Sequence, residues 1–506
     1  MGLHRCSHKC VPSFWFLVIL ALLLVCTGCG SSGANQNSGP AAGIGDTGPI
    51  TPFFSAPSTP LQVRVGDDPS EQILSCDLDV EWIKLKSSTD PAVSVRLLPN
   101  ESTIEFTRLA QTFEPIGLLD TTQGTYDQFE MKITGATVAY IDLFGRPRRQ
   151  VVTTSLTSLV KLDRPVVIGD IPTILDIDVN LAKTVQLSPV TNQISLKGPV
   201  VTVAQNNIAG PGGAPSSMHR GASYAHSSGQ LNTQTGAVDR LVGIASEVGD
   251  DEFTITVGTT ELSLQVHFDG NSVFENVSPA TLDGMLIEVE GWTQPDGSIY
   301  GNEIEGLSSK TGAEVEGFLV SASGSLKVIP QDAVGSGASH SLIGTQVGAI
   351  LGTGVKYSVN SGEEDLTGLP LTFDAKHIFP GQRVEMDSST GLVKIANVMQ
   401  VQPHEVELLH QSLSGTVSNY TIGSTWMPEF DLILSANSHL AILNPGTRTV
   451  HVYQRSTTDM SSLTSDLQDG TSLTIRGFLF CGDSNDVASG TPLHFGLVAS
   501  SMSEVQ

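Results

Sequence analysis

The stretch "YDQFEMKI", residues 126–133, decides the fold class of the chain. Phe129, Met131 and Ile133 alternate in it with polar or charged residues. A period of two places the apolar side chains on one face, which is typical of a half-buried strand in an antiparallel sheet. Similar β-rich segments lie on both sides of it: "LQVRV" (61–65), "VEWIKLK" (80–86), "AVSVRLL" (92–98), "ATVAYIDL" (136–143), "ILDIDVNL" (174–181) and "PVVTVA" (199–204).

These segments together predict a β-sandwich over residues 61–204. Seven or more short strands within one domain, separated by turn residues, favour that architecture. "LFGRPRRQ", residues 143–150, lies between two such strands and predicts a hairpin turn. No segment of the chain keeps a helical period over three turns, so the expected fold class is all-β.

The same region resembles a family of bacterial secreted domains, the domain-of-unknown-function family 4382. Three segments carry the resemblance: "LQVRVGDDP" (61–69), "IGLLDTTQGTYDQFEMKI" (116–133) and "LDIDVNLAKTVQL" (175–187). They extend over most of residues 61–190. The resemblance implies a secreted structural domain, and it brings no known catalytic residues to this chain.

The second half of the chain is repetitive and is expected to form three small barrels. Gly243, Gly317 and Gly415 each open a strand, and a second glycine precedes a later alternating strand 41, 64 and 55 residues further on. The second glycines are Gly284, Gly381 and Gly470. Glycine in a barrel strand usually relieves a tight bend, so we expect all six at bends. The predicted units are residues 240–310, 311–404 and 405–506.

The first of these units, over residues 240–308, resembles the domain-of-unknown-function family 5666, a small barrel similar to the OB-fold. "VGIASEV" (242–248), "LDGMLIEVEGW" (282–292) and "DGSIYGNEIEGL" (296–307) carry this resemblance. The predicted fold is therefore an N-terminal β-sandwich followed by three small OB-like β-barrel units. Residues 205–239, rich in Gly and Ser, form the expected linker between the two parts.

The N-terminus predicts export and a lipid anchor. Arg5 and Lys9 precede an apolar run over 11–25 that is short for a membrane span, which is typical of a secretory signal. "VCTGC" (25–29) resembles the bacterial lipobox. By that resemblance, residues 1–28 are removed and Cys29 receives the lipid. Gly30, where Asp would favour the inner membrane, points to the outer membrane. An ordinary secretory signal is the alternative.

Composition narrows the range of partners. Residues 29–60 are rich in Gly, Ser and Pro and predict a flexible tether. The formal charge of −26 becomes −28 without the two basic residues of the signal. A chain this acidic repels nucleic acid, so no nucleic-acid partner is expected. Cys76 and Cys481 lie far apart in the sequence and imply no disulfide framework.

Two segments could hold a metal ion. "HEVELLH" (404–410) spaces its histidines by six rather than the four of a helical zinc protease, so surface or turn histidines are favoured. Asp176 and Asp178, followed by Asn180, lie on one face of a strand and are weak Ca²⁺ candidates, with Asp67 and Asp68 as further ligands. The alternative for this face is a solvated polar surface opposite the core. No metal or other cofactor is therefore expected.

The chain has no G-x-S-x-G elbow, phosphate-binding loop or dinucleotide fingerprint. A glycosidase pair of carboxylates has no fixed spacing and remains open. Trp82, Trp292 and Trp426 could each stack on a sugar or belong to the core. We expect a non-enzymatic, lipid-anchored cell-envelope protein that binds a ligand or serves as a scaffold or adhesion module. The alternative is a carbohydrate-binding or carbohydrate-active envelope protein. Its partners would be the membrane, through the lipid, and a glycan or another envelope protein.

Overall fold

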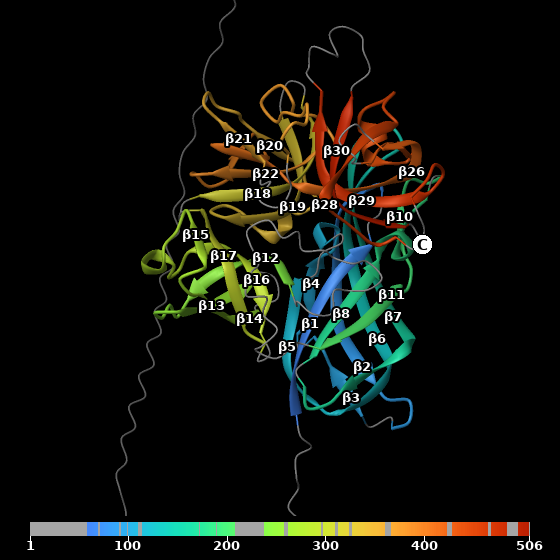
Figure 1. Ribbon diagram of the computed structural model, residues 1–506, viewed down its shortest axis with the longest axis vertical. Coiled ribbons are helices and arrows are strands. Elements are labelled where there is room, and N and C mark those ends of the chain that lie inside the picture. Colours follow the sequence, from blue (N-terminus) through green and yellow to red (C-terminus); the bar gives the residue numbers. More distant parts are fainter. Residues whose placement is uncertain are drawn as a thin grey trace, which may run out of the picture. The chain divides into compact units, whose positions relative to one another are not determined.

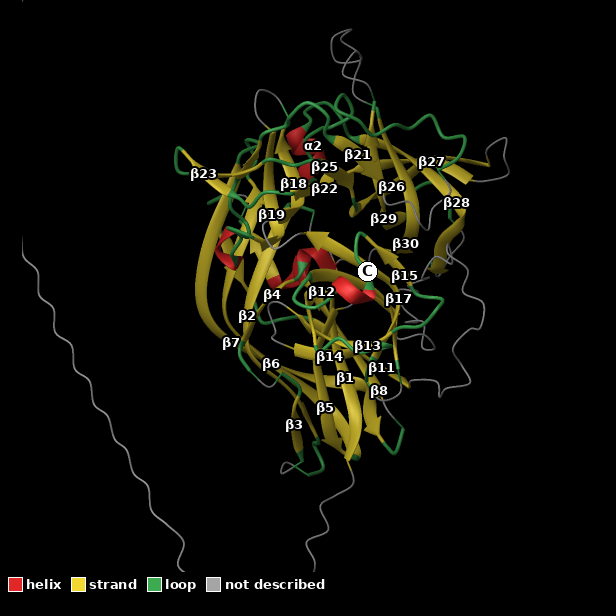
Figure 2. Cartoon of the chain, turned by 90° about the vertical axis from the view of Figure 1, so that its left-hand side faces the viewer, coloured by secondary structure: helices red, strands yellow, loops and turns green. Residues whose placement is uncertain are grey.

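A computed structural model of the chain describes residues 58–504, apart from 69–70, 91–92, 99, 110–113, 172, 189, 208–236, 258–261, 295–296, 309–311, 323–325, 360–365, 423–427, 464–466 and 483–493. All of these residues belong to one compact unit, Ala56–Gln506. It is built almost entirely of strands, as predicted (Figures 1 and 2).

The N-terminal domain is a β-sandwich of two sheets. One sheet has the order β11-β8-β1-β5, with β1 Ser58–Asp68, β5 Glu114–Thr122, β8 Thr173–Asn180 and β11 Val201–Asn207. The other has the order β3-β2-β6-β7, with β2 Ile73–Lys86, β3 Ser94–Arg96, β6 Gly124–Ile141 and β7 Pro147–Ile168, while β4 Ser102–Glu105 pairs with β2. Short elements complete it: η1 Thr107–Leu109, α1 Leu181–Thr184, β9 Val185–Leu187 and β10 Ile194–Leu196.

The apolar residues that alternate within 126–133 are buried, as predicted. Phe129, Met131 and Ile133 are fully buried in the core between the sheets, while the residues between them are partly exposed. Two predicted strands, 126–133 and 136–143, are in fact parts of the single strand β6. Its pairing with β7 shifts between Ile133 and Gly135. The shift moves the buried positions from odd to even numbers, which made one strand look like two.

The predicted hairpin is present. β6 ends at Ile141 and β7 begins opposite it at Pro147. Between them Gly145 donates its backbone N–H to the carbonyl of Asp142 with a φ of 72°. The side chain of Asp142 accepts from the backbone N–H groups of Phe144 and Arg146, which fixes the turn.

The first barrel unit contains β12 Ala237–Ser246, β13 Glu252–Val257, β14 Leu262–His267, β15 Val273–Glu275, η2 Pro279–Thr281, β16 Leu286–Thr293 and β17 Ile299–Ser308. The third contains β26 His410–Ile422, β27 Pro428–Leu434, α2 His439–Leu443, β28 Thr449–Ser462, β29 Ser472–Cys481 and β30 Phe495–Glu504. The five long strands are β12, β13, β14, β16 and β17 in the first unit, and β26, β27, β28, β29 and β30 in the third. In each unit the first of these strands pairs with the second and the fourth, and the third pairs in parallel with the fifth. That is the strand order of a five-stranded Greek-key barrel, so both units are OB-like.

The middle unit follows the same plan with a divided fifth strand. Its elements are β18 Ala313–Ser321, β19 Leu326–Gly335, η3 His340–Leu342, β20 Val347–Ala349, β21 Lys356–Val359, β22 Arg383–Ser388, β23 Val393–Ile395, β24 Val398–Val401 and β25 Glu405–Leu408. β24 pairs in parallel with β20, and β25 pairs with β22. The fifth position is thus shared by two short strands, and β25 joins this sheet although the expected boundary lies just before it.

The glycines of the three units occupy equivalent positions. Gly284, Gly381 and Gly470 have φ values of 73°, 93° and 92°, a region that suits residues without a side chain. Each donates its N–H to a carbonyl two residues beyond the opening glycine of its unit, at 2.8, 2.7 and 2.9 Å. These acceptors are Ala245, Leu319 and Val417. At Gly243, Gly317 and Gly415 a Cβ would lie within 2.7 Å of a carbonyl oxygen on the neighbouring strand. The second glycines therefore lie at turns in all three units, while the opening glycines let the neighbouring strand come close.

A small apolar cluster joins the sandwich to the middle unit. Leu74, Ala139 and Ile141 of the sandwich pack against Phe318, Val320 and Ile329 of β18 and β19. Ile442 and Leu443 of α2 pack against the same cluster from the third unit. The sandwich, the middle barrel unit and the third barrel unit therefore share one buried apolar cluster.

Candidate ligand site

Cys29, the predicted lipidation site, lies outside the described residues, as do the signal and tether. Among the described residues, no helix is long and apolar enough to cross a membrane. The anchor therefore stays a prediction from the sequence.

Asp176 has an internal partner. Arg64 on β1 lies directly opposite it and donates from Nε and Nη2 to its two carboxylate oxygens, at 2.6 and 2.9 Å. Both side chains are buried, so Asp176 does not belong to a solvated polar face as the alternative supposed. Ile174 and Asp176 on one face of β8 are buried, as are Leu175 and Ile177 on the other, so both faces of this strand are covered.

The other calcium candidates lie along the same two strands. Asp178 is opposite Gly66 on β1, and Asp67 and Asp68 are opposite Val179 and Asn180. The side chain of Asn180 accepts the backbone N–H of Lys183 and caps α1. No group of three or more His, Cys, Asp or Glu side chains is placed to hold a metal ion in the part of the chain that the structure describes.

The histidines of residues 404–410 lie in a strand region. β25 separates them, and each has its own contact: His404 Nε2 lies 3.2 Å from Asp387 Oδ2, and the His410 ring stacks on Phe478 at 3.8 Å. Trp82 is half-buried on β2, with the Lys84 ammonium 4.0 Å from its ring. Trp292 is in β16, but its side chain, like all of Trp426, lies outside what is described.

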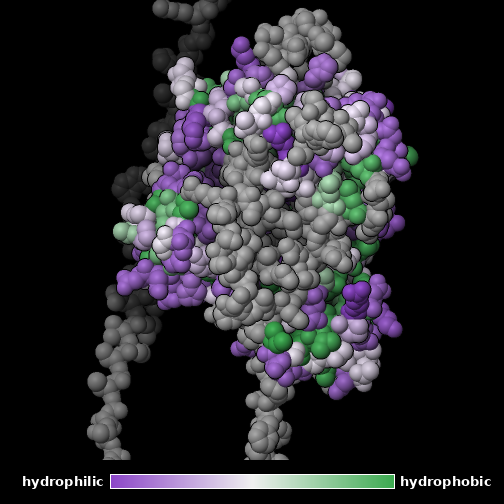
Figure 3. Space-filling view, viewed as in Figure 1, coloured by the Kyte–Doolittle hydropathy of each residue, from purple (hydrophilic) through white to green (hydrophobic). Residues whose placement is uncertain are grey.

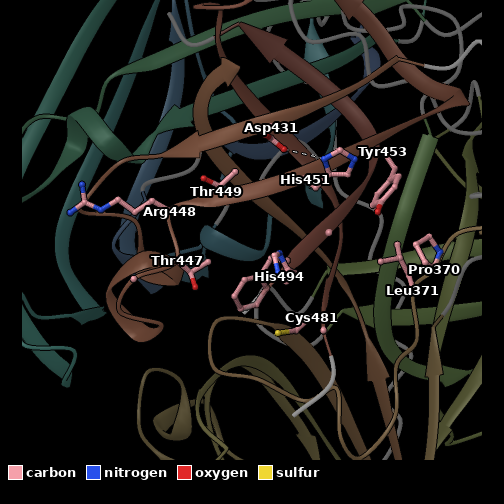
Figure 4. Close-up of a pocket in the computed structure, with 14 residues that line it drawn as sticks. Pro370, Leu371, Asp431, Thr447, Arg448, Thr449, His451, Tyr453, Cys481 and His494 are labelled. Carbon is pink, nitrogen blue, oxygen red and sulfur yellow. Dashed lines mark hydrogen bonds and ion pairs between the residues drawn. The ribbon is translucent and has the colours of Figure 1, made fainter. Parts of the chain in front are cut away.

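A pocket of about 630 Å³ lies on the third barrel unit. Its volume is in the range of sites that hold small molecules. Four strands of the barrel and a loop of the middle unit line it; the residues are Pro370, Leu371, Asp431, Gly446, Thr447, Arg448, Thr449, His451, Tyr453, Cys481, Gly482, His494, Phe495 and Gly496. Figure 4 shows the polar side chains of β27 and β28 gathered at one side of this pocket.

The alternation of β28 sends its polar side chains to the pocket. In "TVHVY" (449–453), Val450 and Val452 are fully buried in the barrel core, so Thr449, His451 and Tyr453 point outward. The outward surface of strands two and three is where barrels of this type bind ligands. This site was not among those predicted from the sequence. The signal that could have found it is the buried apolar pair that alternates with Thr, His and Tyr.

His451 is held between two carboxylates and an aromatic ring. Its Nδ1 lies 3.0 Å from Asp431 Oδ1, and its Nε2 lies 3.6 Å from Glu429 Oε2. Asn419 donates to the other oxygen of Asp431 at 2.8 Å, which fixes that carboxylate. The rings of His451 and Tyr453 meet edge to face, 4.7 Å apart (Figure 4).

Tyr453 supplies an aromatic surface and a hydroxyl. Burial raises its pKa, and the negative charge of Glu429 adds to the effect, so the hydroxyl stays neutral and can donate a hydrogen bond. A Cβ at Gly496 would lie 3.1 Å from the Tyr453 ring and 3.0 Å from Leu371. Gly496 therefore lets the ring and the loop of the middle unit come close to β30.

Comparison with known proteins adds no relative. No protein-family profile matches the chain, and no curated protein matches it.

Proposed function

We propose that the protein is a non-enzymatic, lipid-anchored envelope protein whose third barrel unit binds a polyhydroxylated ligand such as a glycan. The outward face of β28 carries the proposal, because it sets the Tyr453 ring beside the fixed pair of His451 and Asp431. A sugar needs this combination: an aromatic ring that covers its C–H face, and nearby donors and acceptors for its hydroxyls.

The carboxylates of the site favour binding over hydrolysis. Of the described residues that line the pocket, Asp431 alone has a carboxylate. Most glycosidases place two carboxyl groups on either side of the scissile bond. Asp431 also accepts hydrogen bonds from Asn419 and faces His451, which suits it to holding a side chain in place.

The charge distribution supports a ligand other than nucleic acid. In the first unit Glu288 lies opposite Glu305, and Glu290 lies opposite Glu303. Hydrophilic residues cover much of this unit on the face shown in Figure 3. The formal charge of the whole chain, −26, repels a phosphate backbone.

A glycan array probed with the full chain in detergent micelles tests the proposal. We expect Tyr453→Ala to weaken binding about fivefold, since one lost aromatic contact is worth about 1 kcal/mol. Tyr300→Ala is the matched control, because Tyr300 is also a partly exposed strand tyrosine but belongs to the first unit. Equal loss in both variants, or no glycan bound by the wild type, would contradict the assignment.

A scaffolding or adhesion role is the second candidate, and β7 favours it. This edge strand exposes 63% of Val151 and 57% of Leu159, which suits contact with another protein. Cross-linking in intact cells tests this role. Changing both residues to Lys should remove the cross-linked partner while glycan binding remains.

A further inference from the structure

Two buried carboxylates lie directly opposite one another on the sandwich. Asp77 of β2 pairs with Glu105 of β4, and their exposed fractions are 3% and 4%. Their neighbours Cys76 and Leu78 point into the sandwich core, so Asp77 and Glu105 are on its outer face. Like charges directly opposite repel, and burial increases the cost of ionising both.

The middle barrel unit covers this pair. His340 of η3 places Nε2 3.3 Å from Asp77 Oδ2. Gln331 of β19 donates to the Thr107 hydroxyl at 2.7 Å, and that hydroxyl lies 2.5 Å from Glu105 Oε1. The other oxygen of Asp77 is buried without a hydrogen-bond partner among the described residues.

Two arginines of this region each have a carboxylate partner outside the pair: Arg108 pairs with Glu114, and Arg383 pairs with Glu316. The charges of Arg108 and Glu105 also interact. The other charged groups that act on the pair and on His340 are Asp79 of β2, Arg149 of β7 and Asp332 of β19. His340 is therefore the one cation of the middle unit seen in direct contact with the pair among the described residues.

We propose that docking of the middle barrel unit onto the sandwich takes up a proton at the Asp77–Glu105 pair, so that the contact is tight at mildly acidic pH and loosens above neutral pH.

The hydrogen bonds around Glu105 can accommodate that proton. The Thr107 hydroxyl lies 3.3 Å from the Leu74 carbonyl as well as beside Glu105. When Glu105 takes a proton from solvent, its new O–H can donate to Thr107 Oγ1, and the Thr107 hydroxyl can turn to Leu74. Thr107 still accepts from Gln331, so the bond between the domains is kept.

The pKa shifts of the three groups also favour the docked state at low pH. Burial, followed by the charge of Asp77, raises the pKa of Glu105 to about 7 from 4.5, although three donors to its carboxylate oppose the shift. Burial also raises the pKa of Asp77. The hydrogen bond to Asp77 raises the pKa of His340. A group whose pKa is raised in the docked state stabilises that state at low pH and loses this effect as the pH rises through the raised value. All three groups therefore favour docking in acid.

The size of the effect follows from Glu105. If docking caused the whole rise in the pKa of Glu105 from 4.5 to about 7, the docking constant would fall about tenfold between pH 6 and pH 8.5. Asp77 belongs to the same domain and contributes to the rise before docking, so this value is the upper limit for Glu105 alone. The shifts of Asp77 and His340 act in the same direction and would add to this fall.

Hydrogen–deuterium exchange of the full chain in detergent micelles measures the effect. After correction for chemical exchange, protection of β2, β4 and β19 should fall about tenfold from pH 6 to pH 8.5, while β28 and β30 of the third unit stay unchanged. Glu105→Gln should flatten this response. Glu130→Gln is the matched control, because it removes a carboxylate of the same sheet that pairs with Lys86; it should leave the response intact.

A second variant covers the case in which Glu105→Gln does not fold. Asp77→Asn removes the opposing charge, so the midpoint of the pH response should move to lower pH. A purely structural role of Asp77 would instead lower protection equally at every pH, and would overturn the proposal. Equal protection of the wild type at both pH values, or a response lost in Glu130→Gln, would overturn it as well.

Discussion

Replacing Gly470 and Gly381 by Ala should destabilise the protein to different extents. Both residues have a φ near 92°, so Ala pays the same backbone cost of about 1–2 kcal/mol at either site. Ala also lowers the conformational entropy of the unfolded chain, which stabilises the folded protein by about 0.4–1 kcal/mol. For Gly470 nothing lies within 4 Å of the new Cβ. Its net cost should therefore be about 1 kcal/mol.

Gly381 has an additional steric cost. A Cβ there would lie 2.6 Å from Leu440 Cδ1 and 3.4 Å from Leu440 Cα, both in α2 of the third unit. Displacing a fully buried leucine adds about 1–3 kcal/mol, which brings the total to about 2–4 kcal/mol. Because Leu440 belongs to the next barrel, Gly381→Ala should also lower the stability of the third unit.

Scanning calorimetry of the full chain in detergent can test both values. Asn tolerates positive φ better than Ala, so Gly470→Asn should recover part of the loss and serves as the control for backbone strain. Equal destabilisation by Gly470→Ala and Gly381→Ala would refute the steric argument. A neutral Gly470→Ala would refute the argument from φ.

Three further predictions follow from the anchor, the linker and the buried ion pair. Cys29→Ser should release the protein from the membrane fraction; a variant that stays in membranes after a high-salt wash would contradict the lipobox. Limited proteolysis should cut first within residues 205–239, and earlier cleavage inside the sandwich would argue against a linker there. Arg64→Met should cost about 3–5 kcal/mol in urea unfolding because it removes the arginine paired with the buried Asp176, and adding Asp176→Leu should restore much of that loss.

Strands with an apolar inner face, such as β2, β6 and β8, were predicted from their own alternation, whereas β7 was indicated only by the hairpin turn before it. β7 runs over Pro147–Ile168, and none of the residues 147–161 is buried. Its centre, "TTSLTSLV" (153–160), has Ser and Thr at positions where an interior strand would have Val or Ile. β7 is held by pairing with the long strand β6, and that pairing depends on residues elsewhere in the chain.

Asp176 shows a second limit of what alternation in the sequence can predict. Its alternation with Leu175 and Ile177 correctly placed a strand, but alternation alone does not tell which of two faces meets solvent. In β8 both faces are covered, and the polar one is satisfied by Arg64, 112 residues earlier. A pattern within eight residues carries no information on such a partner.

The three barrel units share their turn glycines, and the ligand site lies at positions where the units differ in sequence. The turn glycines are equivalent in all three units because a closed barrel needs the same bend in the same place. The outward side chains of strands two and three are free of that requirement. In the first unit the residues of β14 are Ser, Gln and His at positions 263, 265 and 267, whereas β28 has Thr449, His451 and Tyr453. Repetition in the sequence therefore identifies the framework, and the positions at which one repeat departs from the others are where a binding function should be sought.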